Sequence, residues 1–250
     1  MSETKLILGD VIEELKKLPN ESVDLVITSP PYNCGIDYKV YNDNMEWNDY
    51  YKWCNLWMKE IYRIMKLDAR FCLIHYLSLG QSNNRHAPLM KLNTIGEEIG
   101  YKHHGLAVWW DITLTKLTAW GSWLSASAPY INSPFEGILI LYKEKWKKQQ
   151  KGKTSISKEE FMESCSGIWK IAPEHNRSHP APFPEKLSDR CIKLLSYEND
   201  LVLDPFCGSG TVGVSAEKLK RNFIGIELNP DYLEMAKKRI DDINIENSLI

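Results

Sequence analysis

The 250-residue sequence lacks cysteine pairs of the kind that hold zinc or build a disulfide framework, since none of its six cysteines forms a Cys-x-x-Cys pair. It also lacks any apolar run that approaches the roughly 20 residues needed to span a bilayer. The first five residues show no secretory pattern. We therefore expect a soluble, reduced, cytoplasmic protein with no metal site and no membrane partner.

A large net charge of either sign is also missing. The formal charge is −2, so no global basic field attracts the chain to nucleic acid, and binding to a polyanion must come from local patches. Apolar residues make up 43 % of the chain, enough to cover a wide sheet on both faces. There is neither an internal repeat nor a low-complexity tract, and the length fits one large domain or one domain with an insertion.

What the sequence does contain is a regular alternation of short apolar strands and helices. Strands alternating with helices predict an α/β fold with a mostly parallel sheet and helices on both faces. The clearest helix is expected over residues 49–65, where Tyr50, Trp53 and Trp57 recur at helical spacing. Seven strands are expected, at residues 6–8, 23–27, 71–76, 104–110, 137–142, 201–203 and 223–226, and further helices at 11–18, 89–99, 185–196, 211–220 and 230–240.

The segment Ser29-Pro30-Pro31-Tyr32 directly follows the strand expected at 23–27. Proline has no amide donor, so two prolines end the ladder, fix the backbone and leave nearby carbonyls unpaired at the strand's carboxyl end. A hydroxyl on one side and an aromatic face on the other frame a small pocket that suits a flat ring carrying an amino group. For Tyr32 the alternative interpretation is ordinary core packing.

A Gly-rich turn, Asp204 to Thr211, follows another expected strand. Its Gly-x-Gly-x-x-Gly pattern at 208–213, with Glu227 after the next strand, matches a nicotinamide dinucleotide fingerprint or a tight turn without a ligand. The carboxylate of Asp204 argues against a pyrophosphate and suits a cationic group, such as the amine of a methionine moiety. Glu227 can accept from both hydroxyls of a ribose.

Asp10 ends a third strand and can accept from an adenine amino group. Carboxylates at three strand ends with one glycine turn fit S-adenosylmethionine. A second role for Asp10, as the N-cap of the helix that starts at Val11, is compatible with binding a ligand.

Five motifs in this order resemble the amino-methylating DNA methyltransferases, in the permuted class often called beta, whose catalytic motif Asp/Asn/Ser-Pro-Pro-Tyr/Phe precedes the cofactor motif. The resemblance implies a Rossmann-like methyltransferase fold with a seven-stranded sheet and circularly permuted motif order, in a single catalytic domain over residues 1–250. It covers most of the chain and weakens over residues 111–181. The motifs are Gly9-Asp10, Ser29 to Tyr32, His179-Pro180-Ala181-Pro182-Phe183-Pro184-Glu185-Lys186-Leu187, Asp204 to Thr211, and Ile226-Glu227-Leu228-Asn229-Pro230.

The resemblance also implies the site. The Ser29 hydroxyl and the Pro30 carbonyl would accept the protons of a target amino group, Tyr32 would stack on the base, and no covalent intermediate is needed. The implied catalytic residues are Ser29, Pro30, Pro31 and Tyr32. The implied contacts to S-adenosyl-L-methionine are Asp10, Ser29, Phe183, Lys186, Asp204, Phe206, Gly208, Ser209, Gly210, Thr211, Glu227 and Leu228.

Two irregular stretches, residues 111–135 and 143–181, are expected to face DNA and to recognise the target, because loops this long in a compact domain are usually functional or disordered. We expect Trp120 and Trp123 to cover the sheet rather than line the DNA face. Six lysines either contact phosphates or form a solvated loop. These candidate DNA-binding residues are Lys143, Lys145, Lys147, Lys148, Lys151 and Lys153.

The function that follows is methyl transfer to the exocyclic N4 of cytosine in double-stranded DNA, by the modification partner of a restriction endonuclease, with a homodimer as a candidate assembly. Serine at position 29 leans toward cytosine in this family, and N6 of adenine is the alternative. RNA or a protein glutamine is a less favoured acceptor, a binding module with a degenerate site is a third interpretation, and a dehydrogenase ranks last. The target base must leave the duplex, since its amino group is otherwise paired.

Overall fold

The computed structural model describes residues 2–81, 84–111, 121–131, 133, 135–173 and 184–248. Their main feature is an eight-stranded sheet in the order β1-β10-β9-β2-β3-β7-β6-β8. Within it β7 runs antiparallel to its two neighbours, and the other neighbouring pairs are parallel. The strands are β1 (Thr4–Leu8), β2 (Val23–Thr28), β3 (Met65–Tyr76), β6 (Lys102–Trp110), β7 (Phe135–Tyr142), β8 (Ile168–Lys170), β9 (Leu201–Asp204) and β10 (Asn222–Glu227).

The predicted fold class is confirmed, but the predicted number of seven strands was wrong. The eighth strand, β8, lies within residues 143–181, which we expected to be irregular, and pairs with β6 over three residues. Three residues are too few for an alternating pattern to be visible in the sequence. The same stretch holds α4 (Lys158–Ser164), whose capping box between Ser157 and Glu160 is a readable Ser-x-x-Glu signal.

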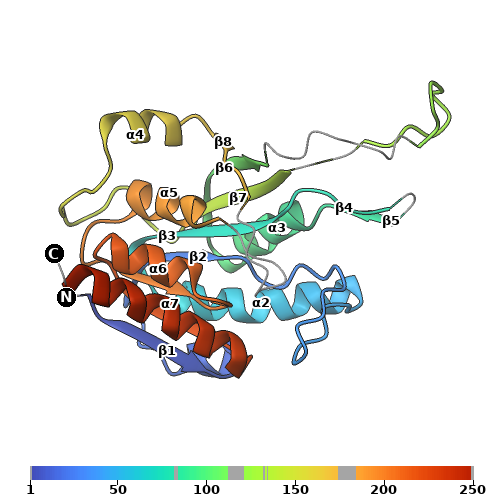
Figure 1. The fold of residues 1–250 in the computed structure, drawn as a ribbon. Helices are drawn as coiled ribbons and strands as arrows, with labels where there is room; N and C mark the ends of the chain where they lie inside the picture. Colours follow the sequence, from blue (N-terminus) through green and yellow to red (C-terminus); the bar gives the residue numbers. More distant parts are fainter. Residues whose placement is uncertain are drawn as a thin grey trace.

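Helices cover both faces of the sheet (Figure 1). On one face α1, α2 and α3 pack side by side, and on the other α5, α6 and α7 do the same. Among the described residues no helix is both long and apolar enough to cross a membrane. The helices are α1 (Val11–Lys16), α2 (Trp47–Ile64), α3 (Pro88–Ile99), α5 (Glu185–Leu195), α6 (Thr211–Lys218) and α7 (Pro230–Ser248).

The helix α2 anchors the first of these faces. Its apolar stripe, which includes Tyr50, Trp57 and Ile61, is fully buried against β2 and β3. Burial of a large apolar side chain contributes about 1.5–3 kcal/mol of transfer free energy. The stripe therefore holds β2 firmly at the centre of the sheet, and with it the segment that follows β2.

The strands β2 and β9 are neighbours, with Leu25 opposite Val202 and Val26 opposite Leu203. Because they are parallel, Thr28 and Asp204 end them on the same side of the sheet. We call this side the carboxyl edge, and the side where β2, β3 and β9 begin the amino edge. The two strands that precede the Ser-Pro-Pro-Tyr segment and the Gly-rich turn therefore lie side by side.

Two further elements extend beyond the carboxyl edge, a hairpin of β4 (Leu79–Gln81) and β5 (Asn84–His86) and the segment 121–131 (Figure 1). They are tied together by Arg85, which donates to the carbonyl of Ile131 at 2.8 Å and lies 4.8 Å from the ring centre of Tyr130. Together they form a projection on the side of the sheet where the motifs lie.

Candidate active site

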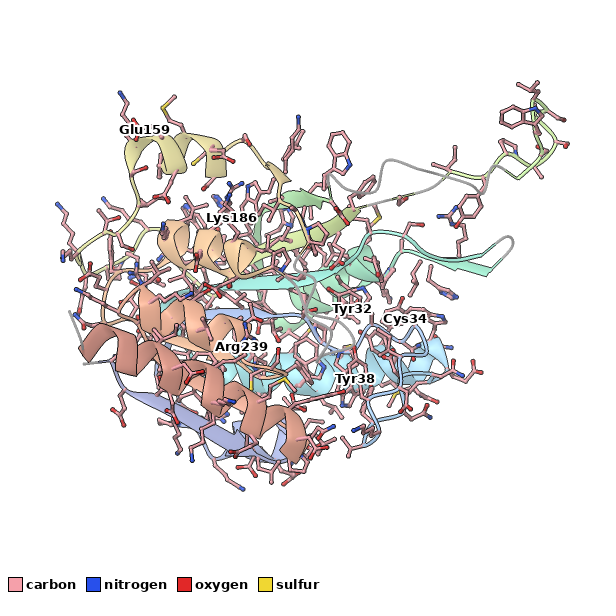
Figure 2. All side chains as sticks on the ribbon, viewed as in Figure 1. Tyr32, Cys34, Tyr38, Glu159, Lys186 and Arg239 are labelled. Atoms are coloured by element: carbon pink, nitrogen blue, oxygen red, sulfur yellow. The ribbon has the colours of Figure 1, made fainter. Side chains whose placement is uncertain are left out.

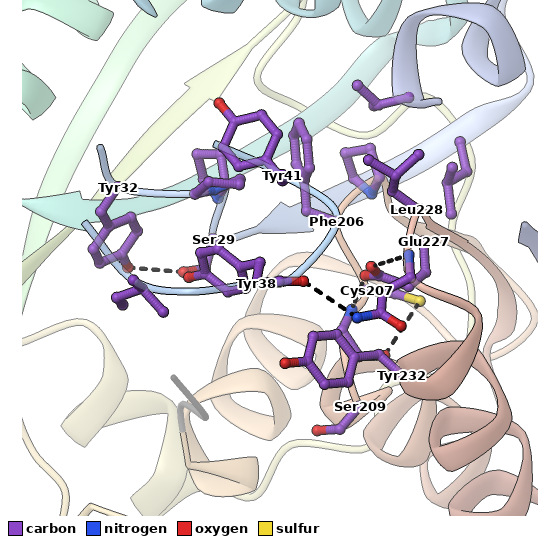
Figure 3. A pocket seen from close by; sticks show the side chains of 18 of the residues that line it. Ser29, Tyr32, Tyr38, Tyr41, Phe206, Cys207, Ser209, Glu227, Leu228 and Tyr232 are labelled. Carbon is purple, nitrogen blue, oxygen red and sulfur yellow. Dashed lines mark hydrogen bonds between the residues drawn. The ribbon is translucent and has the colours of Figure 1, made fainter. Parts of the chain in front are cut away.

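A cavity of about 370 Å³ lies at the carboxyl edge (Figure 3). Most of its wall is built by the stretches that follow β1, β2, β9 and β10. Since these are neighbouring parallel strands, the topology of the sheet brings the stretches together. The predicted site residues that line this wall are Asp10, Ser29, Pro30, Pro31, Tyr32, Phe206, Gly208, Ser209, Thr211, Glu227 and Leu228.

The Gly-rich turn has a backbone that only glycine adopts easily. Gly210 has a φ of +81°, and a Cβ at this position would lie 2.7 Å from the Cβ of Ala236 on α7. Arg239, also on α7, donates to the carbonyl of Ser209 at 2.8 Å and to Oγ1 of Thr211 at 3.3 Å. No sequence pattern points to Arg239, because its role depends on how α7 packs against the turn.

Glu227 is held rigidly in the cavity wall. One carboxylate oxygen accepts from the amide of Gly208 and the other from the amide of Asn229, both at 2.8 Å. Burial raises the pKa of Glu227 above its ordinary value, although backbone hydrogen bonds act to lower it. Each oxygen keeps a second lone pair, so the carboxylate can accept from two neighbouring hydroxyls.

Asp204 lies behind the wall rather than in it. Its Oδ1 accepts from Thr28 Oγ1 at 2.8 Å and from the amide of Phe206 at 3.1 Å, so the side chain joins the ends of β9 and β2. Burial raises its pKa to about 7. The structure thus brings Asp204 to the carboxyl edge but turns its hydrogen bonds toward the sheet.

Asp10 stabilises the start of α1 and also lies in the cavity wall. Its Oδ1 accepts from the amides of Ile12 and Glu13 at 3.0 and 3.2 Å, so the predicted N-cap of α1 is confirmed. The residue also lines the cavity, which leaves its contact to a ligand a prediction.

The Ser-Pro-Pro-Tyr segment carries a chain of hydrogen bonds. Ser29 Oγ donates to Tyr32 Oη at 2.8 Å, and Tyr32 Oη donates to Glu136 Oε2 at 2.7 Å. Glu136 belongs to β7 and lines the same cavity. Burial raises the pKa of Glu136 to about 7, although the hydrogen bond from Tyr32 acts to lower it.

A second set of polar contacts, made by Tyr50 of α2 and His75 of β3, supports the same segment. Tyr50 Oη donates to the carbonyl of Pro31 at 2.7 Å and lies 3.0 Å from Nε2 of His75. Burial lowers the pKa of His75 to about 3, so its ring is neutral. Tyr32 stacks on this ring, with centroids 4.3 Å apart, and is almost fully buried while still lining the cavity. Both interpretations of Tyr32, packing and a place in the pocket, therefore hold.

The loop at residues 33–45 covers the cavity from the other side. Asp43 organises it by accepting from the amides of Asn33, Cys34 and Ile36 at 2.7, 3.1 and 3.0 Å. The aromatic side chains of the loop, including that of Tyr38, line the cavity. The Tyr38 carbonyl accepts from Asn229 Nδ2 at 3.3 Å. The loop is rich in Asn and Asp, a composition typical of turns that could have predicted it from the sequence.

The remaining predicted site residues lie elsewhere. Lys186 is exposed on α5 (Figure 2) and, like Gly210, does not line the cavity. Phe183, with most of the motif at 179–187, lies outside the described residues, as does Trp120. Trp123 is 68 % exposed in the projecting segment, so the expectation that it covers the sheet was wrong.

None of the six candidate DNA-binding lysines lines the cavity. Lys148 Nζ lies 3.3 Å from Asp24 and 3.0 Å from Asp200, and its side chain is only 9 % exposed. Lys143 is buried and donates to the carbonyl of Met65 at 2.9 Å. These contacts are at the amino edge, opposite the cavity. Lys145 bonds Gln149, Lys153 pairs with Glu198, and Lys147 and Lys151 are exposed.

Residues 23–238 of the chain match the DNA methylase family of N6- and N4-methyltransferases. The chain belongs to this family. It is 41 % identical to the type II methyltransferase M.MjaVI of Methanocaldococcus jannaschii over 162 residues, which is 64 % of this chain and 82 % of that protein. The matched family region spans both the Ser-Pro-Pro-Tyr segment and the Gly-rich turn, and in this methylase the Ser-Pro-Pro-Tyr segment comes first.

Two solved structures share the fold. TTHA0409 of Thermus thermophilus, in complex with S-adenosyl-L-methionine, superposes with a TM-score of 0.78 at 24 % identity, covering 96 % of this chain and 94 % of that one. The cytosine-N4-specific PvuII DNA methyltransferase superposes with a TM-score of 0.74 at 22 % identity, covering 98 % and 91 %. The α/β methyltransferase fold of this methylase follows from these superpositions.

Proposed function

We propose that this methylase transfers a methyl group from S-adenosyl-L-methionine to the exocyclic N4 of cytosine in a short duplex target, as the modification component of a type II restriction-modification system. The observation that carries the proposal is the single cavity shared by the Ser29 hydroxyl and the Gly-rich turn. One motif can present an amino nitrogen and the other a methyl donor within the same enclosed space.

The cavity fits the proposed cofactor. Its volume falls within the range of small-molecule sites, about 300–1,000 Å³, and its wall combines aromatic and carboxylate side chains. Glu227 would hold the ribose hydroxyls, Asp10 the adenine amino group, and the backbone of Gly208 and Ser209 the methionine moiety. When bound, S-adenosyl-L-methionine supplies an electrophilic methyl group.

The residues of the catalytic segment would position the acceptor. The amino nitrogen of a base is a weak nucleophile because its lone pair is delocalised into the ring. Ser29 Oγ and the Pro30 carbonyl would accept its protons and localise that lone pair, so that positioning and preset acceptors supply the catalysis. The base reaches this depth only after leaving the duplex stack.

Cytosine N4 is proposed over adenine N6 because serine rather than aspartate stands at position 29. Adenine remains the second candidate, because it offers the same amino group beside a ring nitrogen. Mass analysis of nucleosides from DNA methylated by the purified chain distinguishes the two, with N6-methyladenine alone contradicting the proposal.

We also propose that the projection of β4, β5 and residues 121–131 contacts the DNA. It extends from the carboxyl edge and exposes Trp123 and Leu124, whereas the buried lysines of the amino edge are committed to internal partners. A cognate endonuclease, a homodimer and a cytoplasmic location complete the proposal.

Incubation with tritium-labelled cofactor and DNA, RNA or protein in parallel tests the acceptor class. We expect label in duplex DNA. Label confined to RNA or to protein would overturn the proposal, and the absence of label from all three would favour a binding module.

A further inference from the structure

Glu136 is a carboxylate outside all five motifs that nonetheless lines the cavity. It is 104 residues from Tyr32 in the sequence, and only the antiparallel placement of β7 beside β3 brings it to the carboxyl edge. Its Oε2 lies 2.7 Å from Tyr32 Oη, which lies 2.8 Å from Ser29 Oγ. Three side chains from two distant segments thus form one continuous hydrogen-bonded chain that ends at the proposed catalytic hydroxyl.

The chain has a definite direction. An ionised carboxylate only accepts hydrogen bonds, so the single proton of Tyr32 Oη points at Glu136. Tyr32 Oη must then accept from Ser29, so the Ser29 proton is directed at Tyr32 and not at an incoming amino group. Both lone pairs of Ser29 Oγ remain for an incoming amino group. A serine hydroxyl, which elsewhere donates as readily as it accepts, is an acceptor here.

We propose that Glu136 is a positioning residue that acts through Tyr32, keeping Ser29 an acceptor toward the target amino group and receiving the proton which that group loses. The proposal rests on the proposed methyl transfer and adds to it a proton path. An aspartate at position 29 would be an acceptor by itself. A serine at this position obtains the same property from a carboxylate two hydrogen bonds away.

The reaction step balances along this path. The nitrogen lone pair attacks the methyl carbon, the nitrogen–carbon bond forms, and the sulfur–carbon bond breaks with its electron pair left on sulfur. The nitrogen then holds one proton too many. This proton passes to Ser29 Oγ as the Ser29 proton passes to Tyr32 Oη and the Tyr32 proton to Glu136 Oε2. The products are a neutral methylated amine and a protonated Glu136, which releases its proton to solvent before the next turnover.

Among the ionisable groups around this path, Glu136 is the one that changes its protonation state near pH 7. Its cross-strand neighbours are Tyr76 on β3 and Trp109 on β6. Burial raises the pKa of Tyr76 to about 12 and that of Tyr32 well above its ordinary value, and burial lowers that of His75 to about 3. These groups stay neutral near pH 7, whereas the pKa of Glu136 is about 7. Since the path needs the carboxylate, kcat should rise as pH increases through 7.

The test compares Glu136→Gln with the parent and with Glu136→Asp. The glutamine keeps the shape but neither the charge nor the proton affinity. We expect kcat to fall about 10²-fold, in line with the loss of an acid–base group, with the KM for DNA and the calorimetric Kd for the cofactor within about twofold of the parent. The rise of kcat through pH 7 should vanish in Glu136→Gln and return in Glu136→Asp.

Two controls separate this role from a structural one. Glu144→Gln changes a half-exposed glutamate just beyond β7 that bonds Lys102, and it should leave kcat unchanged. Asp204→Asn removes the other carboxyl at this edge whose pKa is about 7, and the pH dependence should persist in it. If Glu136→Gln fails to fold, Tyr32→Phe breaks the same path and should abolish the same pH dependence.

The outcomes separate the two proposals. A parent that transfers no methyl group to DNA refutes the proposed function. An active parent whose Glu136→Gln and Tyr32→Phe variants keep both kcat and its rise through pH 7 refutes the proton path alone.

Discussion

The two edges of the sheet treat buried charge in opposite ways. At the amino edge, carboxylates are matched by lysines: Asp24 accepts from Lys66 at 2.7 Å and lies 3.3 Å from Lys148. Burial acts to raise the pKa of Asp24, but the hydrogen bond from Lys66 and the charge of Lys148 lower it below its ordinary value. The Asp24 carboxylate therefore has its cationic partners within the chain.

At the carboxyl edge, the buried Asp204 and the half-buried Glu136 and Glu227 have hydroxyl and amide partners instead. Glu136 accepts from Tyr32, Asp204 from Thr28, and Glu227 from backbone amides. Burial raises the pKa of all three. Buried carboxylates without a cation are costly, and their concentration around one cavity is typical of a functional site. A ligand with a sulfonium and an amine supplies positive charge beside these three carboxylates, whose hydrogen-bond partners given above are neutral.

The largest effect is expected for Ser29→Ala. Removal of the hydroxyl leaves the amino group without its preset acceptor, so kcat should fall about 10²- to 10³-fold, while the calorimetric Kd for the cofactor changes far less. Ser166→Ala, in a turn that does not line the cavity, is the matched control. A Ser29→Ala variant that methylates as fast as the parent would show that the Ser29 hydroxyl at the carboxyl edge is not needed for methyl transfer.

Lys148→Ala should destabilise the chain without touching catalysis. It takes one cation from Asp24 and Asp200, and breaking a buried pair from one side costs about 3 kcal/mol. Urea unfolding measures this loss, with exposed Lys151→Ala as control. If Lys148→Ala instead keeps its stability and weakens DNA binding with a smaller salt dependence, the lysine contacts phosphates and the contrast between the edges is lost.

Glu227→Ala sharpens the contrast from the other side. The variant loses the charged acceptor to which the ribose hydroxyls would donate, so the calorimetric Kd for the cofactor should rise about 10- to 100-fold. Glu234→Ala, an exposed glutamate on α7, is the control. An unchanged Kd would mean that Glu227 only fixes the Gly208 turn.

The smallest effect concerns pH and stability. A carboxyl whose folded pKa is raised favours the folded state below its ordinary pKa, and this contribution is lost as pH rises through the folded value. For Asp204 the window runs from 3.8 to about 7. Asparagine cannot ionise. The unfolding free energy of Asp204→Asn should therefore rise relative to that of the parent as pH increases across this window, on the order of 1 kcal/mol or more. Parallel pH profiles of urea unfolding for parent and variant would contradict this.

Much of the fold and of the cavity follows from local sequence. The stripe of Tyr50, Trp57 and their neighbours predicts α2, and the switch-point rule predicts that the segments after β2 and β9 meet. Glu136 was missed because it is 104 residues from Tyr32 in the sequence. Only the antiparallel pairing of β7 with β3 brings the two side chains together. The ion pairs of Lys148 could not be predicted for the same kind of reason, since a run of lysines does not tell which of them packs against a distant Asp24.

The most direct test of the shared cavity is a crystal structure of this chain with S-adenosyl-L-methionine or a stable analogue. The account predicts ribose hydroxyls at Glu227 and a methyl group directed toward Ser29, with the chain Ser29–Tyr32–Glu136 intact. A cofactor bound outside the cavity, or one whose methyl group points away from Ser29, would contradict it.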